Sequence, residues 1–352
     1  MLQERYCEFH PGVDDAGKRL DRVLRRMLPD IRLGEIFAII RTGKVRINGR
    51  KVKGQHRLSA SDVLQLERSL TPEVSATAKA SQNPAKSASS GMYRPLNDGQ
   101  IARSGTRSES PHRTGDDTRS LADCIIFENE HLLCINKPRG ITVHGPSSVH
   151  SWVKRYLSGR VQPSLSFRVG PLHRIDRNTT GVVFFSKSAI GARRFTSLMR
   201  RGVPRKVYLA VLNGSLRSPQ VWEDMLVRDR EAQRTEIADA GSRAITAVYP
   251  VLWTEHHTLA LCTIQTGRTH QIRAQASYHG HPLVGDGKYS GGPGSYALHA
   301  LAFILPERDE ELGFLHVYAS PADSVVKTVD RLFGSIPEEL LLQSLETAAS
   351  LI

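Results

Sequence analysis

The segment from Thr71 to Ser120 most constrains the fold of this chain, because it divides the chain into two separately folding parts. Ser, Thr, Ala, Gly and Pro dominate the segment, aromatic residues are almost absent, and the apolar residues show no period. Such a composition buries too little apolar surface to offset the entropy lost on ordering. We therefore expect residues 71–120 to form a flexible tether between a small module, residues 1–70, and a larger domain, residues 121–335, which a helical tail at residues 336–352 follows.

The charge of the chain favours a polyanionic partner. Its 48 Lys and Arg residues exceed its 35 Asp and Glu residues, which leaves a formal net charge of +13. This excess indicates nucleic acid before a membrane surface. No stretch reaches the roughly 18–20 apolar residues of a membrane span, and the start, MLQERYCEFHPG, has no apolar region of a secretory signal. We therefore expect a globular, cytoplasmic protein that does not bind membranes.

Cysteines and histidines give no metal-ligand pattern. The cysteines lie far apart or within apolar runs, and no CxxC pair occurs, so we interpret them as reduced core residues: Cys7, Cys124, Cys134 and Cys262. An HxxD sequence with downstream histidines would suit a metallophosphohydrolase, and the histidines concerned are His173, His270, His279, His281 and His299. They lack local ligand spacing, and the basic GRTHQIR sequence would repel a cation. The sequence therefore predicts no metal site.

The first module reads as two short helices followed by a hairpin. GKRLDRVLRRML at residues 17–28 carries apolar residues at the spacing of one helix face, namely Leu20, Val23, Leu24, Met27 and Leu28. LGEIFAIIR repeats this pattern. VRINGRKV then alternates apolar and polar residues around Asn48-Gly49, which is a strong hairpin signal.

These elements form one cationic face that suits phosphates. A solvated charge run on a small packing domain is the alternative. The order of helix, helix and basic hairpin over residues 17–66 resembles the S4 RNA-binding domain, a small α/β domain. The resemblance implies RNA contacts by basic residues of the helices and hairpin, for which we take Arg19, Arg22, Lys44 and Arg46.

The larger domain contains more strand-like than helix-like segments. Short apolar runs bounded by turn residues predict strands in CIIFENEHLLCINK, VVFFSK, KVYLAVLNG, AITAVYPVLW and LALCTIQTG. SAIGARRFTSLMRRG and THQIRAQASYHG predict helices. Because strands and helices do not alternate regularly, we expect an α+β fold on a mixed, largely antiparallel sheet with flanking helices, and not a Rossmann fold.

Four motifs occur in order in this domain: LHRIDRNTTGVVFFSK, KVYLAVLNG, TGRTHQIRAQASYHGHPLVGDGKYSG and ALHALAF. Each alone is weak. Together, and with NKPRGITVHG upstream, the series closely resembles the RluA-type family of RNA pseudouridine synthases over residues 121–320. The resemblance implies the pseudouridine synthase fold, an RNA substrate, and an isomerisation that needs no cofactor.

The resemblance also implies roles for single residues. HRID makes Asp176 the catalytic aspartate, KVYLA makes Tyr208 the tyrosine that stacks on the extruded base, and THQIR makes Arg273 the partner of the aspartate. Arg174 matches the arginine that enters the RNA where the target nucleotide leaves the stack. The sequence departs from the usual HRLDxxTSG at Asn178 and Thr180, where we expect the turn to survive. Further substrate contacts are expected from His173, Arg268 and Leu298.

Asp176 lies between two arginines in sequence, but they need not be its partners. On extended backbone, residues two apart point the same way and adjacent residues point opposite ways, so Arg174 can share the face of Asp176 while Arg177 does not. The S4-like module favours large-subunit (23S) ribosomal RNA as the substrate. A transfer RNA synthase of the same family, or a catalytically silent S4-type RNA-binding factor, remain alternatives. We expect a monomer without an obligate protein partner.

Overall fold

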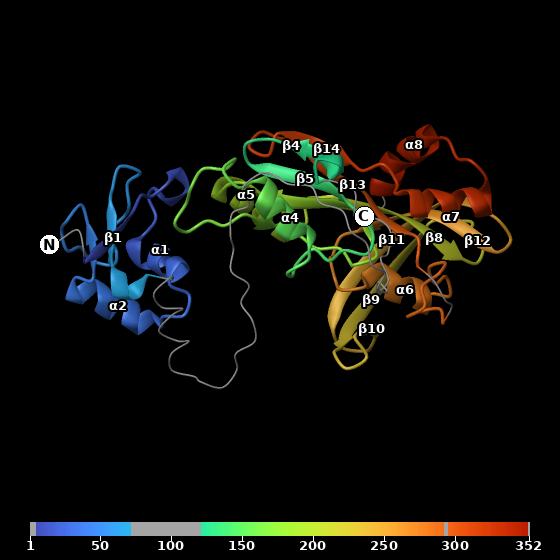
Figure 1. The fold of residues 1–352 in the computed structure, drawn as a ribbon. Coiled ribbons are helices and arrows are strands. Elements are labelled where there is room, and N and C mark those ends of the chain that lie inside the picture. Colours follow the sequence, from blue (N-terminus) through green and yellow to red (C-terminus); the bar gives the residue numbers. More distant parts are fainter. Residues whose placement is uncertain (1–4, 72–120, 292–294, 351–352) are drawn as a thin grey trace, which may run out of the picture. The chain divides into compact units, whose positions relative to one another are not determined.

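The computed structural model describes residues 5–71, 121–291 and 295–350 (Figure 1). The chain forms two compact units: the described part of the first comprises residues 5–71 together with Pro163–Ser166, and the second comprises the remainder. Apart from Thr71, the predicted tether lies outside the described residues. No helix within the described ranges is long and apolar enough to cross a membrane.

The first unit contains both predicted helices and a small sheet. Its elements are β1 (Tyr6–Phe9), α1 (Leu20–Met27), α2 (Leu33–Thr42), β2 (Val45–Ile47) and β3 (Leu64–Glu67), with short 3-10 helices at Val13–Asp15 and Arg68–Leu70. The strands pair antiparallel in the order β1-β3-β2. The apolar face predicted for the first helix is buried, since Leu20, Val23 and Leu24 are fully inaccessible. This face joins α2 and the sheet in one core.

The structure forms only part of the hairpin predicted at VRINGRKV. Asn48 (φ 51°) and Gly49 (φ 78°) form the tight turn, across which Ile47 and Arg50 exchange backbone hydrogen bonds of 2.9 Å. Beyond this single bridge, β2 pairs with the distant β3. The residues after the turn accept hydrogen bonds from the first N–H groups of α1. The carbonyl of His56 accepts from the Leu20 N–H at 2.8 Å, and that of Gly54 accepts from the Asp21 N–H at 3.0 Å. The first N–H groups of a helix need such acceptors, which explains why the second hairpin strand is absent.

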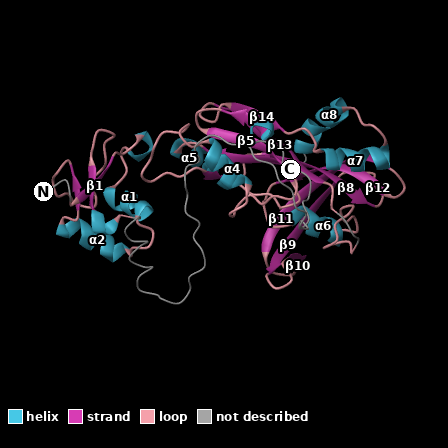
Figure 2. Ribbon diagram, in the orientation of Figure 1, coloured by secondary structure: helices cyan, strands magenta, loops and turns pink. Residues whose placement is uncertain are grey.

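The second unit is built on one large sheet (Figure 2). The strand order is β10-β9-β11-β12-β8-β13-β7-β5-β4, with β14 beside β13 and β6 beside β7. All neighbours are antiparallel except β13 and β7, so the predicted mixed, largely antiparallel sheet is confirmed. The strands are β4 (Ile125–Glu128), β5 (Leu132–Lys137), β6 (Gly170–Pro171), β7 (Thr180–Ser186), β8 (Arg205–Asn213), β9 (Gln220–Asp229), β10 (Arg234–Ile237), β11 (Ser242–Trp253), β12 (His257–Ile264), β13 (Leu298–Asp309) and β14 (Phe314–Tyr318).

Helices pack on both faces of this sheet. They are α4 (Val149–Tyr156), α5 (Ala189–Arg200), α6 (Gln271–Tyr278), α7 (Asp323–Phe333) and α8 (Glu338–Ala349). Because side chains alternate along a strand, β8 directs Tyr208 into the core that includes residues of α5 and α6, and Leu209 into the core with α7 and α8. The helix predicted in the tail, residues 336–352, is α8, and it packs on β8, β11 and β12.

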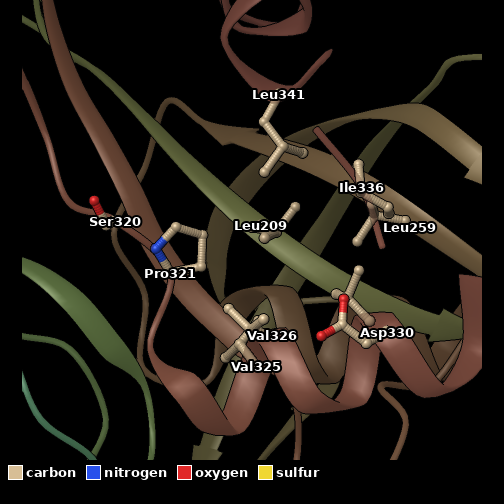
Figure 3. Close-up of a pocket in the computed structure, with 10 residues that line it drawn as sticks. Leu209, Leu259, Ser320, Pro321, Val325, Val326, Asp330, Ile336 and Leu341 are labelled. Carbon is tan, nitrogen blue, oxygen red and sulfur yellow. The ribbon is translucent and has the colours of Figure 1, made fainter. Parts of the chain in front are cut away.

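An apolar cavity of about 240 Å³ lies on the α7 and α8 side of the sheet (Figure 3). Leu209, Leu259, Val325 and Leu341 are among its lining residues, and Asp330 is the one charged side chain of the lining. The face that holds Tyr208 is the opposite one. This cavity is therefore separate from the site described below.

The free thiols fit the role expected of core residues. Cys124, Cys134 and Cys262 are buried, and Cys7 is half-buried. Burial raises the pKa of the Cys262 thiol to about 12. This thiol is protonated at neutral pH, as expected for a structural cysteine.

Two imidazoles are held inside the second unit as neutral rings. His173 lies among the rings of Phe184, Phe195 and Phe303, and its Nε2 accepts from the Phe184 N–H at 3.1 Å. His299 joins two segments, since its Nε2 lies 2.9 Å from the carbonyl oxygen of Ala319 and its Nδ1 lies 2.7 Å from the hydroxyl of Thr180. Burial lowers the pKa of His173 to about 3 and that of His299 to about 4.

We expect the protein to lose stability as the pH falls from about 6.5 toward 4. In this window an unfolded chain binds protons at these imidazoles while the folded chain does not, so the free energy of unfolding falls by about 1.4 kcal/mol per pH unit for each imidazole. Their contribution is fully present above the unfolded pKa. Urea unfolding at several pH values measures this slope, and His299→Asn should reduce it. The matched change at the exposed His316 should leave the slope as it is; equal slopes in both variants would contradict the assignment.

Candidate active site

The carboxylate of Asp176 lies on a turn just before strand β7. The Thr179 N–H donates to the Asp176 carbonyl at 3.2 Å and closes this turn. β7 then begins at Thr180 and runs parallel to β13, with Gly181 opposite Ala300. Gly181 has a φ of 108°, and a Cβ there would collide with the Ala300 backbone, so only glycine allows this close approach. The approach fixes the position of the turn relative to β13.

The NKPRG sequence supports the same turn from its other side. The Lys137 ammonium is fully buried and donates to the carbonyls of Pro138, Ile141 and Arg177 at 2.8–3.0 Å. Burial lowers the pKa of Lys137 to about 7, against the opposing charge of Asp176. Arg177 in turn donates from Nε to the Gly140 carbonyl at 2.7 Å. Arg177, which flanks Asp176 in sequence, therefore stabilises the backbone around the turn and does not pair with the Asp176 carboxylate.

The structure brings Asp176 and Arg273 together, although 97 residues separate them. Nη1 of Arg273, on α6, lies 3.3 Å from Oδ2 of Asp176. The Asp176 side chain is 24% exposed, whereas that of Arg273 is 8% exposed. A carboxylate that a substrate can reach is thus paired with a guanidinium that solvent barely reaches.

A second carboxylate, Asp286, binds the other edge of the same guanidinium. Nε and Nη2 of Arg273 donate to its two oxygens at 2.7 and 2.8 Å. The charged form of Arg273 is opposed by burial, but the hydrogen bond to Asp286 and the nearby negative groups outweigh burial and raise its pKa. The sequence analysis gave Asp286 no role, although it lies in GDGKYSG, at the end of the motif that begins with TGRTHQIR.

Aromatic rings flank Arg273 on this side of the site. Its guanidinium carbon lies 4.3 Å from the ring centre of Tyr296 and 5.0 Å from that of Tyr289. Burial, followed by the charge of Asp176, raises the pKa of Tyr296 to about 12. The Tyr296 hydroxyl also lies 3.3 Å from that of Thr179, in the Asp176 turn. Neither tyrosine was predicted as a site residue.

His270 is the third group beside Asp176. It has a left-handed backbone, with φ 53°, just before α6, and its Nε2 lies 3.9 Å from Oδ2 of Asp176. Its Nδ1 lies 3.0 Å from the Tyr289 hydroxyl. Burial lowers the pKa of His270 to about 4, with Asp176 opposing this shift. The imidazole is therefore neutral at neutral pH.

Tyr208 lies on β8, beside β12 and β13. It pairs with Cys262 on one side and Ala300 on the other, and only 8% of the residue is exposed. Burial and then the charge of Asp176 raise its pKa, so the phenol keeps its proton. Leu298, expected at the pocket wall, is buried with Tyr208 in the same core.

The other predicted contacts of this unit lie apart from the carboxylate pair. Arg174 is exposed, and Arg268 is exposed with its Nε donating to the Arg243 carbonyl at 3.2 Å. His173 is held in its phenylalanine cluster, which gives it a packing role. Thr180, which departs from the family pattern, begins β7 and contacts His299, so the turn survives as expected.

The basic residues predicted to bind RNA in the first unit are partly engaged with carboxylates. Arg19 pairs with Asp21 at 2.9 Å, and Lys44 pairs with Glu67 at 3.2 Å. The Arg46 guanidinium lies 5.3 Å from the centre of the Tyr6 ring. Arg22 is exposed on α1. A phosphate that binds Arg19 or Lys44 therefore has to compete with Asp21 or Glu67 for the positive charge.

The arrangement around Asp176 suits covalent or acid–base chemistry. A carboxylate with an arginine partner can attack an electrophilic carbon or accept a proton. The protonated phenol of Tyr208 can stack on a planar ring and donate one hydrogen bond. Within the described residues, no three His, Cys, Asp or Glu side chains lie close enough to hold a metal ion.

Comparison with protein families gives two matches. Residues 131–278 match the family described as RNA pseudouridylate synthase, and residues 18–64 match the S4 domain. The first match includes Asp176, Tyr208 and Arg273, but ends before Asp286.

Individual relatives agree with these matches. The ribosomal large subunit pseudouridine synthase C of Vibrio vulnificus (strain CMCP6) is 29% identical over 277 residues, which is 78% of either chain. The enzyme of the same name from Escherichia coli (strain K12) is 28% identical over 286 residues, covering 78% of this chain and 77% of the relative. Among solved structures, human RNA Pseudouridylate Synthase Domain Containing 4 superposes with a TM-score of 0.51 at 23% identity, over 60% of this chain and 94% of the other. This structural similarity shows that the second unit has the fold of that protein.

Proposed function

We propose that this chain, which belongs to the RNA pseudouridylate synthase family, converts specific uridines of large-subunit ribosomal RNA to pseudouridine. The observation that carries this proposal is the pairing of Asp176 with Arg273 beside Tyr208, within the matched family region. The relatives named above favour ribosomal RNA over transfer RNA. A monomeric state and a cytoplasmic location stay predictions.

The reaction breaks the bond from uracil N1 to ribose C1′ and forms a bond from C5 to C1′. The uracil turns between these steps, and the proton on C5 leaves while N1 gains one, so the product is an isomer of the substrate. The carboxylate of Asp176 serves either as a nucleophile towards the sugar or base, or as the base that assists glycal formation. Each of these routes needs a carboxylate beside the sugar and base, a role that we assign to Asp176.

Tyr208 is proposed to receive the extruded base. Taking a nucleotide out of the stack costs a few kcal/mol, and stacking on an aromatic side chain returns about 1–3 kcal/mol per base. Because the raised pKa keeps its phenol protonated, Tyr208 adds no negative charge next to Asp176. Arg174, which is exposed, is proposed to occupy the gap left in the RNA.

The first unit is proposed to add affinity for RNA. It matches the S4 domain and contributes exposed basic residues, including Arg22, to a chain of net charge +13. Phosphate contacts of this kind supply binding that carries little sequence information. A catalytically silent S4-type factor is disfavoured, because the chain retains the carboxylate, guanidinium and phenol to which this proposal assigns the chemistry.

Mapping of pseudouridines in cells with and without this chain tests the function. Carbodiimide-dependent stops of reverse transcriptase should disappear at particular uridines of large-subunit ribosomal RNA when the gene is deleted, and should return with the full chain. Stops lost only from transfer RNA would replace the ribosomal proposal with the transfer RNA alternative. As a control, complementation with residues 121–352 alone should restore fewer stops, because phosphate contacts of the first unit are removed.

A further inference from the structure

We propose that Asp286 is a positioning residue for the reaction, which orients the Arg273 guanidinium and limits its hold on Asp176. This inference rests on the proposed function. It gives a role to a residue to which the sequence motifs assigned none, and which lies beyond the family match, since that match ends at residue 278.

The distances indicate that Arg273 is anchored on Asp286 and only presented to Asp176. Its contacts to Asp286 measure 2.7 and 2.8 Å, within the usual range of a charge-assisted hydrogen bond of about 2.7–2.9 Å. Its contact to Asp176 measures 3.3 Å. The bidentate pair uses Nε and Nη2, so the planar group has Nη1 left to direct at Asp176.

Rotation of the guanidinium out of this plane is opposed by the neighbouring rings. Tyr289 and Tyr296 lie within cation–π distance of the group, while the two hydrogen bonds to Asp286 fix its angle within the plane. Together these contacts define one direction for Nη1. A lysine in place of Arg273 would lack both the fork and the planar face.

Asp286 is itself held rigidly. Only 1% of it is exposed, and its Oδ1 accepts from the Lys288 N–H at 3.2 Å. Its carbonyl accepts from the Ser290 N–H at 2.7 Å. The preceding Gly285 has φ 80°, and a Cβ there would lie 2.9 Å from the Ser295 carbonyl oxygen. The backbone therefore places the carboxylate before Arg273 binds it.

The two carboxylates share one buried cation. If Asp286 were neutral, the whole charge of Arg273 would act on Asp176, and the guanidinium would be free to form a short bidentate pair with it. Such a pair would occupy the oxygens that must reach the substrate. Asp286 thus keeps Asp176 oriented but available.

The test compares Asp286→Asn with wild type in single-turnover assays on the RNA uridine. The rate of the chemical step should fall about 10- to 100-fold, because a displacement of about 1 Å at a catalytic group has an effect of this size, while the RNA dissociation constant stays unchanged. Asp309→Asn is the matched control: Asp309 is also buried and accepts from Arg194 Nε at 2.7 Å, away from this site. It should leave the rate as it is.

A double-mutant cycle separates positioning from general structural damage. If Asp286 acts through Arg273, then Asp286→Asn should have no further effect on the rate in an Arg273→Ala background. An unchanged rate in Asp286→Asn, or the same loss in both backgrounds, would overturn the inference.

Asp286→Glu keeps the charge and should recover part of the rate if the asparagine variant proves unstable. No recovery in a folded glutamate variant would also count against the inference. An inactive wild type would overturn the proposed function, whereas an active wild type with a fully active Asp286→Asn overturns this inference alone.

Discussion

Asp176→Asn is expected to lower pseudouridine formation by about 10³-fold or more, the scale of losing a catalytic nucleophile or base, and to leave RNA affinity nearly intact. Asparagine keeps the shape of the side chain but has no charge, so it can neither attack carbon nor accept a proton effectively. Affinity comes mostly from basic contacts elsewhere. Because the Asp176 side chain is 24% exposed, the substitution should be tolerated by the fold.

Tritium release from RNA with C5-labelled uridine, run in the presence of EDTA, measures this effect. Wild-type activity that persists in EDTA and vanishes in the variant supports a synthase and argues against the metallohydrolase considered from the HxxD sequence. Asp239→Asn changes an exposed carboxylate between β10 and β11 and should remain active. An active Asp176→Asn enzyme would refute the assigned role of this residue.

Arg273→Ala is expected to damage both turnover and stability. The substitution leaves the carboxylate of Asp286, which is 1% exposed, without its partner, and breaking a buried ion pair in this way costs about 3–5 kcal/mol. Turnover should fall at least about 100-fold, because Asp176 loses the group that orients it. Arg273 therefore contributes to the folded state and to the reaction through different edges of one side chain.

Denaturant unfolding and the tritium assay distinguish these two contributions. Adding Asp286→Asn to Arg273→Ala removes the unpaired buried charge, so the double variant should regain much of the lost stability while turnover stays low. If Arg273→Ala unfolds at the wild-type denaturant concentration, the buried pair does not stabilise the protein and this account is wrong.

Local sequence patterns correctly predicted those helices and turns whose conformation does not depend on contacts with distant parts of the chain. The helical spacing from Leu20 to Leu28 gave α1, because its apolar face determines its packing. The Asn48-Gly49 turn was also predicted correctly, but the strand expected after it is absent, because the residues that follow the turn accept hydrogen bonds from the first N–H groups of α1. A pattern within one segment contains no information on such a competing partner.

The candidate site shows the same limit. The resemblance identified Asp176, Tyr208 and Arg273 by their motifs, and the structure places the first and last 3.3 Å apart. It did not identify Asp286, because a motif gives residue types and not the direction of a guanidinium edge. Nor did it predict that the ring of His173 packs among phenylalanines, which depends on residues from β7, α5 and β13.

The parallel pairing of β7 with β13 also affects the order in which the protein matures. Thr180 pairs with His299, which lies 119 positions later in the sequence, and contacts so distant in sequence form only after a long loop has closed. While the ribosome is still synthesising the chain, β7 has no β13 to pair with, and the turn before it lacks its support. The turn that carries the reactive carboxylate therefore reaches its final geometry only after β13 has been synthesised.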